Sequence, residues 1–298
     1  DTYGFPVDMT QSILNEKKIS LDLEKYRSIV QLNKDSQKKT WNKKQHQTNK
    51  NFFLQISKIK KETFFCGYEF STSETKLIKI IKKDKAFNSI SDFKDCILIF
   101  DKTPFYAEAG GQVADSGEIL DTENNIVGHI SDVQKTEKGI YLHFLSKCNQ
   151  EITVNKKYFL RIDVHRRNKI RNNHSATHLL HESLRQVVGK HVSQRGSLVN
   201  EEKLRFDYTS HRQLSIEEIK IIESKVNNAI RLNMNTSVEE MPVKQAMESG
   251  AIALFGEKYP DIVRVVCMKK NKTEEPDTLT SIELCGGTHV NQTGEIGL

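Results

Sequence analysis

The stretch Ile140-Tyr-Leu-His-Phe144 decides the fold of the middle of the chain, because apolar side chains occupy every second position along it. A period of two is typical of a β-strand with one buried face. Similar short runs, separated by turn residues, lie at 77–81, 96–100, 126–130 and 158–164. Short strands divided in this way predict a small antiparallel β-barrel or sandwich over residues 63–162.

The hydrophobic period changes after Asp163, where Ile170, His174, His178 and His181 recur every three or four residues. This spacing predicts a helix that Gly189 ends. Further along, 191–199, 204–208 and 262–268 have strand character, Ser215-Ile-Glu-Glu218 is a capping box for a second helix, and a short helix fits between Pro242 and Gly250. Mixed helices and strands predict an α+β domain over residues 163–298.

The N-terminal part has a different composition. Residues 1–12 contain the turn Gly4-Phe-Pro6 and are expected to be the exit from a preceding domain. Residues 13–62 are expected to form a basic linker, helical from about Ser20 to Glu62, because Pro and Gly are absent there. The predicted fold class is therefore α+β: a basic helical linker, a small antiparallel β-barrel and a final α+β domain.

Composition and charge narrow the classes of protein. With 37% hydrophobic and 28% charged residues in 298, and no apolar run near the roughly 18 residues of a membrane helix, no membrane span is expected. Five scattered cysteines favour a reducing cytoplasm over a secreted disulfide framework. Of the net charge of +6, residues 33–62 supply nine Lys against two acidic residues. This segment suits either nucleic-acid phosphates or a solvated linker.

Two short motifs indicate a metal site. His174-Ser-Ala-Thr-His178 places two imidazoles one helical turn apart on one face, and Cys285-Gly-Gly-Thr-His289 brings a thiolate and an imidazole together on a glycine-rich turn. Three imidazoles and a thiolate suit Zn²⁺, so we expect one zinc ion that ties the helix to the distant turn. A metalloprotease is disfavoured, because Ser175 stands where that mechanism requires Glu.

Two further features of the sequence each allow two interpretations. Arg166, Arg167 and Lys169 lie near the helix start, where cations oppose the macrodipole; they either meet an external phosphate or form a solubilising surface. Gly110-Gly111 either lets the backbone approach a ligand closely or makes an ordinary hairpin turn.

Several long motifs together resemble the alanyl-tRNA synthetase family, in the family's order and over almost the whole chain. The motifs are Asp1-Thr-Tyr-Gly-Phe-Pro6, Thr103-Pro-Phe-Tyr-Ala-Glu-Ala-Gly-Gly-Gln112, Asn173-His-Ser-Ala-Thr-His-Leu-Leu-His181, His191-Val-Ser-Gln-Arg-Gly-Ser-Leu-Val199, Leu204-Arg-Phe-Asp207 and Leu284-Cys-Gly-Gly-Thr-His-Val290. The family commonly has Ser at the position of Ala109. The resemblance implies the end of an aminoacylation region, a linker, a β-barrel and a zinc-containing editing domain.

The implied activity is hydrolysis of serine or glycine wrongly esterified to the 3′ end of alanine tRNA. The resemblance also implies that the ATP- and Mg²⁺-dependent charging site lies before Asp1, so this chain alone is not expected to charge tRNA. The oligomeric state is left open. A non-catalytic, zinc-stabilised module that binds the tRNA acceptor end is the alternative function.

The resemblance also implies individual roles. His174, His178, Cys285 and His289 match the family's zinc ligands, although whether zinc is catalytic or structural stays open. Gln194 corresponds to a family residue important for editing and is expected to position water, unless it only faces solvent. Thr177, which lies between the two metal-binding His, is either the contact for the serine hydroxyl or a packing residue. His181 is left as packing or as a neighbour of the ligands.

Overall fold

The computed structural model describes residues 49–91, 96–210, 212–253, 259–269 and 279–297, together with the single residues 14, 22, 25 and 28. It divides into two compact units, residues 1–58 with 83–85 and residues 59–82 with 86–298. Helix α3 (Asn49–Ser57) belongs to the first unit. The expected end of the aminoacylation region, residues 1–12, and most of the basic linker lie outside the described residues.

The helix expected to continue to Glu62 ends at Ser57, so that boundary is wrong. The physical reason lies in the backbone that follows. The amide of Thr63 donates to the carbonyl of Gly139, and the amide of Phe64 donates to that of Asp101. Residues that pair with strands in this way are extended, so the chain leaves the helical conformation before it reaches them.

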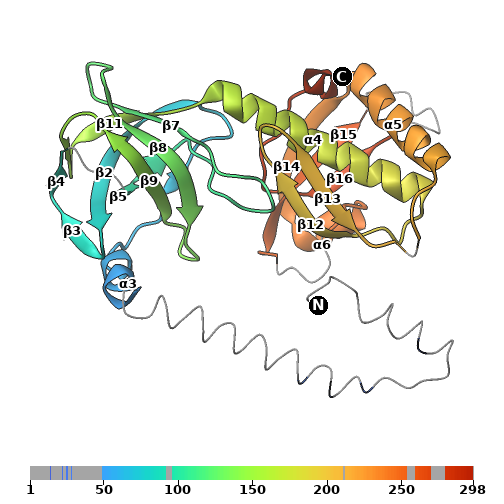
Figure 1. Ribbon diagram of the computed structural model, residues 1–298, viewed down its shortest axis with the longest axis horizontal. Coiled ribbons are helices and arrows are strands. Elements are labelled where there is room, and N and C mark those ends of the chain that lie inside the picture. Colours follow the sequence, from blue (N-terminus) through green and yellow to red (C-terminus); the bar gives the residue numbers. More distant parts are fainter. Residues whose placement is uncertain are drawn as a thin grey trace. The chain divides into compact units, whose positions relative to one another are not determined.

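A closed antiparallel barrel of six strands follows, which confirms the predicted barrel (Figure 1). Its strands pair in the order β11-β7-β8-β9-β5-β2, and pairing between β11 and β2 closes the barrel. The bounds are β2 (Thr72–Lys82), β5 (Cys96–Phe100), β7 (Gly117–Leu120), β8 (Ile126–Lys135), β9 (Tyr141–Cys148) and β11 (Lys157–Ile162). The predicted runs fall within five of these strands apart from one or two residues at two ends, and β7 was not predicted.

The strands of the barrel place apolar side chains on their inner faces. Leu77, Leu98, Phe100, Ile130 and Leu160 are at most 2% exposed and belong to one apolar cluster inside the barrel. Five short strands pair in the same part of the chain. Strand β1 (Phe64–Phe65) is parallel to β6 (Lys102–Thr103), and β10 (Ile152–Thr153) is antiparallel to β4 (Ser89–Ile90). Strand β3 (Lys85–Phe87) pairs with β2.

The last part of the chain mixes helices and strands, which confirms the α+β prediction (Figure 1). Its elements are α4 (Val164–Val187), β12 (Gln194–Val199), β13 (Leu204–Tyr208), α5 (Ile216–Arg231), β14 (Asn235–Pro242), α6 (Val243–Glu248), β15 (Ile262–Lys269), β16 (Ser281–Leu284) and the 3₁₀ turn η1 (Thr293–Ile296). The hairpin β12–β13 is one sheet, and β14-β15-β16 is another. Strands β14 and β16 were not predicted; in β14 no side chain is fully buried, so it lacks an apolar alternation.

The two long helices begin as their sequences predict. The carboxylate of Asp163 accepts a hydrogen bond from the amide of Arg166, which starts α4 at Val164. At α5 the Ser215 hydroxyl and the Glu218 carboxylate form the expected reciprocal capping box. Among the residues that the structure describes, none of the helices combines the length and apolar character needed to cross a bilayer.

Candidate metal centre

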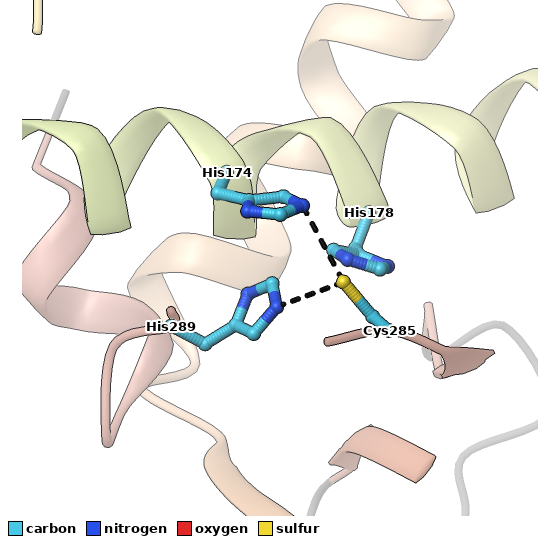
Figure 2. A group of neighbouring side chains, drawn as sticks. All are labelled: His174, His178, Cys285 and His289. Carbon is cyan, nitrogen blue, oxygen red and sulfur yellow. Dashed lines mark hydrogen bonds between the residues drawn. The ribbon is translucent and has the colours of Figure 1, made fainter. Parts of the chain in front are cut away.

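The structure brings the two predicted halves of the metal site together. His174 and His178 project from successive turns of α4, while Cys285 and His289 come from the loop after β16 (Figure 2). One donor atom from each of the four side chains lies within 4.8 Å of all the others. All of them are buried except Cys285, which is partly buried. This cluster can hold a metal ion.

Its spacing is compatible with zinc. The Cys285 Sγ atom lies 3.5 Å from His174 Nε2 and 3.3 Å from His289 Nε2. A tetrahedral zinc ion with ordinary bond lengths separates its sulfur and nitrogen ligands by about 3.5 Å. Three imidazoles with one thiolate form a donor set that zinc commonly accepts. The chemistry of the predicted ligands and these two sulfur–nitrogen distances are therefore compatible with zinc.

The other nitrogen of each histidine has a partner outside the cluster. His174 Nδ1 is 2.7 Å from the Gln112 Oε1 atom, and His289 Nδ1 is 3.3 Å from the Ser175 hydroxyl. His178 Nδ1 is 2.9 Å from a carboxylate oxygen of Glu283, whose other oxygen meets His181 at 3.0 Å. Such partners fix the orientation and tautomer of metal-binding imidazoles. His181 thus lies beside the ligand set, as expected.

Electrostatics favour the ionised forms that a metal requires. Burial disfavours the thiolate, yet the neighbouring His174 and His289 hold the pKa of Cys285 well below its usual value. Burial also raises the pKa of Glu283, but the adjacent His178 lowers it to about 2, so the carboxylate is ionised. Burial lowers the pKa of His178, but Glu283 and the Cys285 thiolate raise it to about 10, so a metal ion bound at Nε2 would displace the proton held there.

Two residues that the sequence did not single out shape the Cys285–His289 loop. The Arg264 guanidinium donates to the carbonyls of Cys285 and Gly287, both at 2.8 Å. Tyr68 donates to the carbonyl of Gly286 at 2.5 Å, and its ring lies 4.2 Å from the centre of the Arg264 guanidinium. These contacts hold the loop from the side of the barrel and from β15.

A cavity of about 630 Å³ adjoins the metal centre. It is lined by three of the four donors, His174, His178 and Cys285, and by both predicted catalytic residues, Thr177 and Gln194. Gln194 is the first residue of β12. The Thr177 hydroxyl donates to the carbonyl of Asn173 in the preceding turn of α4, at 2.8 Å. The structure thus places both residues at the same cavity as the donors.

The Gly110-Gly111 pair forms a hairpin turn, in which Ala109 and Gln112 exchange two backbone hydrogen bonds. Both glycines have positive φ, at 59° and 82°. A Cβ atom on Gly111 would lie 2.6 Å from the Ser197 carbonyl oxygen, whereas Gly110 faces open space and lines the cavity. The turn alternative is therefore observed, and Gly110 remains accessible to a ligand.

The cations near the start of α4 differ in their surroundings. Arg167 is buried and bonded to the Asp115 carboxylate and to the carbonyls of Gly67 and Pro104. Arg166 pairs with Glu201 at 2.8 Å and donates to the carbonyl of Ala114. These internal partners account for both cations without an external phosphate, while Lys169 is exposed.

Comparison with known families now defines the class. Residues 1–166 match the family model of tRNA synthetases class II (A). Residues 263–298, which contain Cys285 and His289, match that of the threonyl and alanyl tRNA synthetase second additional domain. The fold and the donor set thus occur in a chain of the class II tRNA synthetase type.

Individual relatives identify the family within this class of tRNA synthetases. Alanine–tRNA ligase from Chelativorans sp. (strain BNC1) is 38% identical over 299 residues, and that from Campylobacter jejuni (strain RM1221) is 41% identical over 298. Both alignments include all of this chain and cover 34% and 33% of those relatives. The chain belongs to the alanyl-tRNA synthetase family. It spans about a third of the length of the curated relatives it matches.

Proposed function

We propose that this part of the molecule hydrolyses the ester that joins serine or glycine to alanine tRNA, beside a zinc ion held by the four donors. The single observation that supports the proposal is the cavity of about 630 Å³ that adjoins the donor set and is lined by Thr177 and Gln194. A cavity with a few polar groups at one wall is the usual form of a small-ligand site. The aminoacyl group and the terminal adenosine are its proposed occupants.

The chemical need for this activity comes from the limits of binding selectivity. A pocket shaped for alanine cannot strongly reject an amino acid that adds one hydroxyl or loses one methyl, and discrimination stays near roughly 10²-fold. A second, hydrolytic site corrects the remaining errors. Such a site must accept serine and reject alanine, so it needs a polar partner for the serine hydroxyl.

Thr177 is suited to that contact. Its hydroxyl proton is donated to the carbonyl of Asn173, so the lone pairs of Oγ1 remain available as acceptors. A serine hydroxyl in the cavity would donate to Oγ1, and the methyl group of alanine would leave the same oxygen unpaired in a site that is only 5% exposed. An unpaired buried acceptor costs about 1–3 kcal/mol, which favours serine.

Gln194 would orient the attacking water. A carboxamide has no basic group at neutral pH, so its role is to hold water by hydrogen bonds at the ester carbonyl. A bound zinc ion would supply fixed positive charge at the cavity wall. If all four donors held the ion, as in structural zinc sites, the hydrolysis would depend on positioning by the chain's own side chains.

The tRNA itself would meet the exposed Lys169 and the open backbone at Gly110. A lysine side chain supplies a mobile positive charge for a phosphate, and a glycine without a neighbouring side chain lets a ribose or phosphate approach closely. Arg166 and Arg167 would act indirectly, through the internal bonds that hold the start of α4.

The test is a deacylation assay. The zinc-loaded protein is incubated with alanine tRNA charged with serine, glycine or alanine, and release of the amino acid is followed. We expect the fastest release of serine, because only its hydroxyl can donate to Thr177, and slow release of alanine; release of glycine above that of alanine would reflect exclusion of the methyl group by the cavity. Binding of zinc and tRNA without release above buffer would contradict the proposal and would favour the alternative, a non-catalytic module for the acceptor end.

A substitution sharpens the test. Gln194→His replaces the proposed water-positioning amide at the cavity, and Gln213→His makes the same change at an exposed loop position as the matched control. We expect Gln194→His to reduce the rate of serine release at unchanged zinc content, and Gln213→His to leave it unchanged. Equal rates in both variants would remove Gln194 from the mechanism.

A further inference from the structure

We propose that Gln112, the last residue of the hairpin turn at 109–112, is a positioning residue of the metal centre. It joins the two halves of the ligand set, His174 on α4 and the loop that carries Cys285 and His289. The inference does not rest on the proposed hydrolysis, because it concerns the geometry and affinity of the metal site.

Four contacts carry the inference. The Gln112 Oε1 atom is 2.9 Å from the Thr288 amide nitrogen and 2.7 Å from His174 Nδ1. The Thr288 Oγ1 atom lies 3.0 Å from Gln112 Nε2 and 3.3 Å from Oε1. The Gln112 side chain is fully buried, so no water replaces these partners. A single carboxamide thereby touches one ligand and the residue that precedes another.

The donors and acceptors fix the state of His174. A backbone N–H can only donate, so the atom of Gln112 that faces the Thr288 amide must be the carbonyl oxygen. The same oxygen faces His174 Nδ1, so Nδ1 carries the proton. His174 Nε2 is then the unprotonated nitrogen, and it lies 3.5 Å from Cys285 Sγ inside the donor cluster. Gln112 therefore selects the tautomer that can bind a metal.

The backbone around Gln112 is held in place independently. The amide of Val199 donates to the carbonyl of Gly111 at 2.7 Å, and the amide of Val113 donates to the carbonyl of Val199 at 3.0 Å. Gln112 thus forms a parallel bridge with Val199 at the end of β12. The hairpin turn at 109–112 thereby adds to the sheet that carries Gln194, so the backbone of Gln112 is fixed independently of its side-chain contacts.

The metal-binding loop is shaped around the same contact. A Cβ atom on Gly287 would lie 2.0 Å from His174 Cε1, 2.4 Å from His174 Nδ1 and 3.0 Å from Gln112 Oε1. Only glycine fits beside this pair without displacing it. The second glycine of Cys285-Gly-Gly-Thr-His289 is therefore explained by the bond between Gln112 and His174.

The experiment compares three variants by their affinity for zinc, measured by competition with a chelator. Gln112→Met keeps the shape and removes the polar atoms; because loss of such a partner typically weakens metal binding 10- to 100-fold, we expect a loss of about that size. Gln112→Glu offers carboxylate oxygens to the same donors and should restore affinity close to that of the unaltered protein. Gln134→Met breaks side-chain bonds to Glu108 and Asp132 elsewhere in the barrel and should leave it unchanged.

A second readout distinguishes positioning from a general loss of stability. In the zinc-loaded protein, the proton on His174 Nδ1 should give a protected signal in ¹H–¹⁵N spectra of the imidazoles. The signal should persist in Gln112→Glu and be lost in Gln112→Met. Unchanged affinity and signal in Gln112→Met would overturn the proposal, as would failure of the unaltered protein to bind zinc.

A further variant keeps the inference open to refutation if Gln112→Met does not fold. Thr288→Val is nearly isosteric and removes only the hydroxyl that meets the Gln112 amide. We expect weaker zinc binding than in the unaltered protein and a smaller loss than the methionine variant would give. Unchanged affinity in Thr288→Val, together with a retained His174 signal in that variant, would then overturn the proposal.

Discussion

The barrel and helix α4 bury different kinds of side chain. In the barrel, one apolar cluster draws residues from all six strands. In α4, by contrast, buried polar and charged residues outnumber the buried apolar ones, Ile170, Leu179 and Leu184. Apolar burial stabilises a fold without a partner, whereas buried polar groups stabilise it only when every one is bonded. The barrel is therefore expected to be stable by itself. The last part of the chain also has apolar clusters, but the polar face of α4 at the donor cluster is expected to depend on the ion.

The two parts are nevertheless joined by polar contacts. The Arg167 side chain, near the first turn of α4, is bonded to Asp115 and to the carbonyls of Gly67 and Pro104 beside the barrel. Gln112 meets the metal-binding loop from the barrel hairpin. Loss of the ion should thus loosen the last part of the chain while these connections keep it attached.

The largest expected effect is the loss of the metal itself. In Cys285→Ala one donor is removed, and we expect zinc content by elemental analysis to fall. Because a structural zinc ion supplies about 10–16 kcal/mol in small domains that fold around it, unfolding of the metal-binding part should begin at a much lower temperature. Hydrogen exchange should show lost protection in α4 and β16 and retained protection in β5 and β9.

A second cysteine supplies the control for that comparison. Cys267 lies on β15, is free and half-buried, and is absent from the donor cluster. Cys267→Ala removes a thiol at a similar depth, so zinc content should stay unchanged. If barrel amides lose protection as far as those of α4 do in Cys285→Ala, then the two parts unfold as one and the contrast between them is wrong.

A substitution in the barrel core, which leaves the metal ligands in place, tests the other side of the comparison. Leu98 is fully buried in the barrel cluster, and Leu98→Ala should lower the free energy of unfolding by about 2–5 kcal/mol. Zinc stoichiometry should remain that of the unaltered protein, because the substitution leaves all four donors in place. Ile97, the half-buried neighbour on the other face of β5, gives the control, since Ile97→Ala should cost less. Loss of zinc in Leu98→Ala would show that the barrel core also governs the metal site.

The same contrast explains what could be predicted from the sequence. The run at 140–144 has an apolar period of two and the other runs are short apolar stretches between turn residues, so five of the six barrel strands were found. The exposed β14 has no such pattern and is held by its pairing with β15. The metal ligands were found because His174 and His178 have helical spacing and Cys285 and His289 lie in one short motif. Boundaries set by distant partners, such as the end of α3, were missed.

The residues around the ligands could not be predicted in the same way. Glu283, Ser175 and Arg264 act on the site through contacts that only the folded chain creates. Glu283 and Arg264 lie outside the two motifs, and the position of Ser175 inside the first motif does not reveal its contact with His289. Gln112 had a weak signal, since it ends the glycine-rich motif Thr103–Gln112, but its bond to His174 joins residues 62 positions apart. Sequence patterns indicate local structure, such as a turn or a strand, and do not indicate hydrogen bonds between residues far apart in the sequence.

The smallest expected effect concerns the one buried histidine of the barrel. His143 Nδ1 lies 3.2 Å from the carbonyl of Leu98, so this nitrogen carries a proton, and Nε2 accepts a bond from the Thr103 hydroxyl at 2.8 Å. Burial lowers the pKa of His143 to about 4, against about 6.5 when the chain is unfolded. The folded barrel therefore holds this imidazole in its neutral form.

This pKa difference sets the direction of a pH effect. Above about pH 6.5 the imidazole is neutral in both states, and the pKa difference contributes nothing to the free energy of unfolding. Between about pH 6.5 and pH 4 only the unfolded chain takes up the proton. The free energy of unfolding therefore falls as the pH falls through this range. The loss reaches at most about 3 kcal/mol. In His143→Gln this contribution disappears, so denaturant unfolding of the zinc-free protein should show a shallower pH dependence over that range than the unaltered chain. The comparison is made without zinc because release of the ion at acid pH would otherwise add its own slope, which belongs to the metal-binding part. Equal slopes for the two proteins would mean that the folded barrel admits a charged imidazole, and the contrast between its apolar interior and the polar face of α4 would then fail at His143.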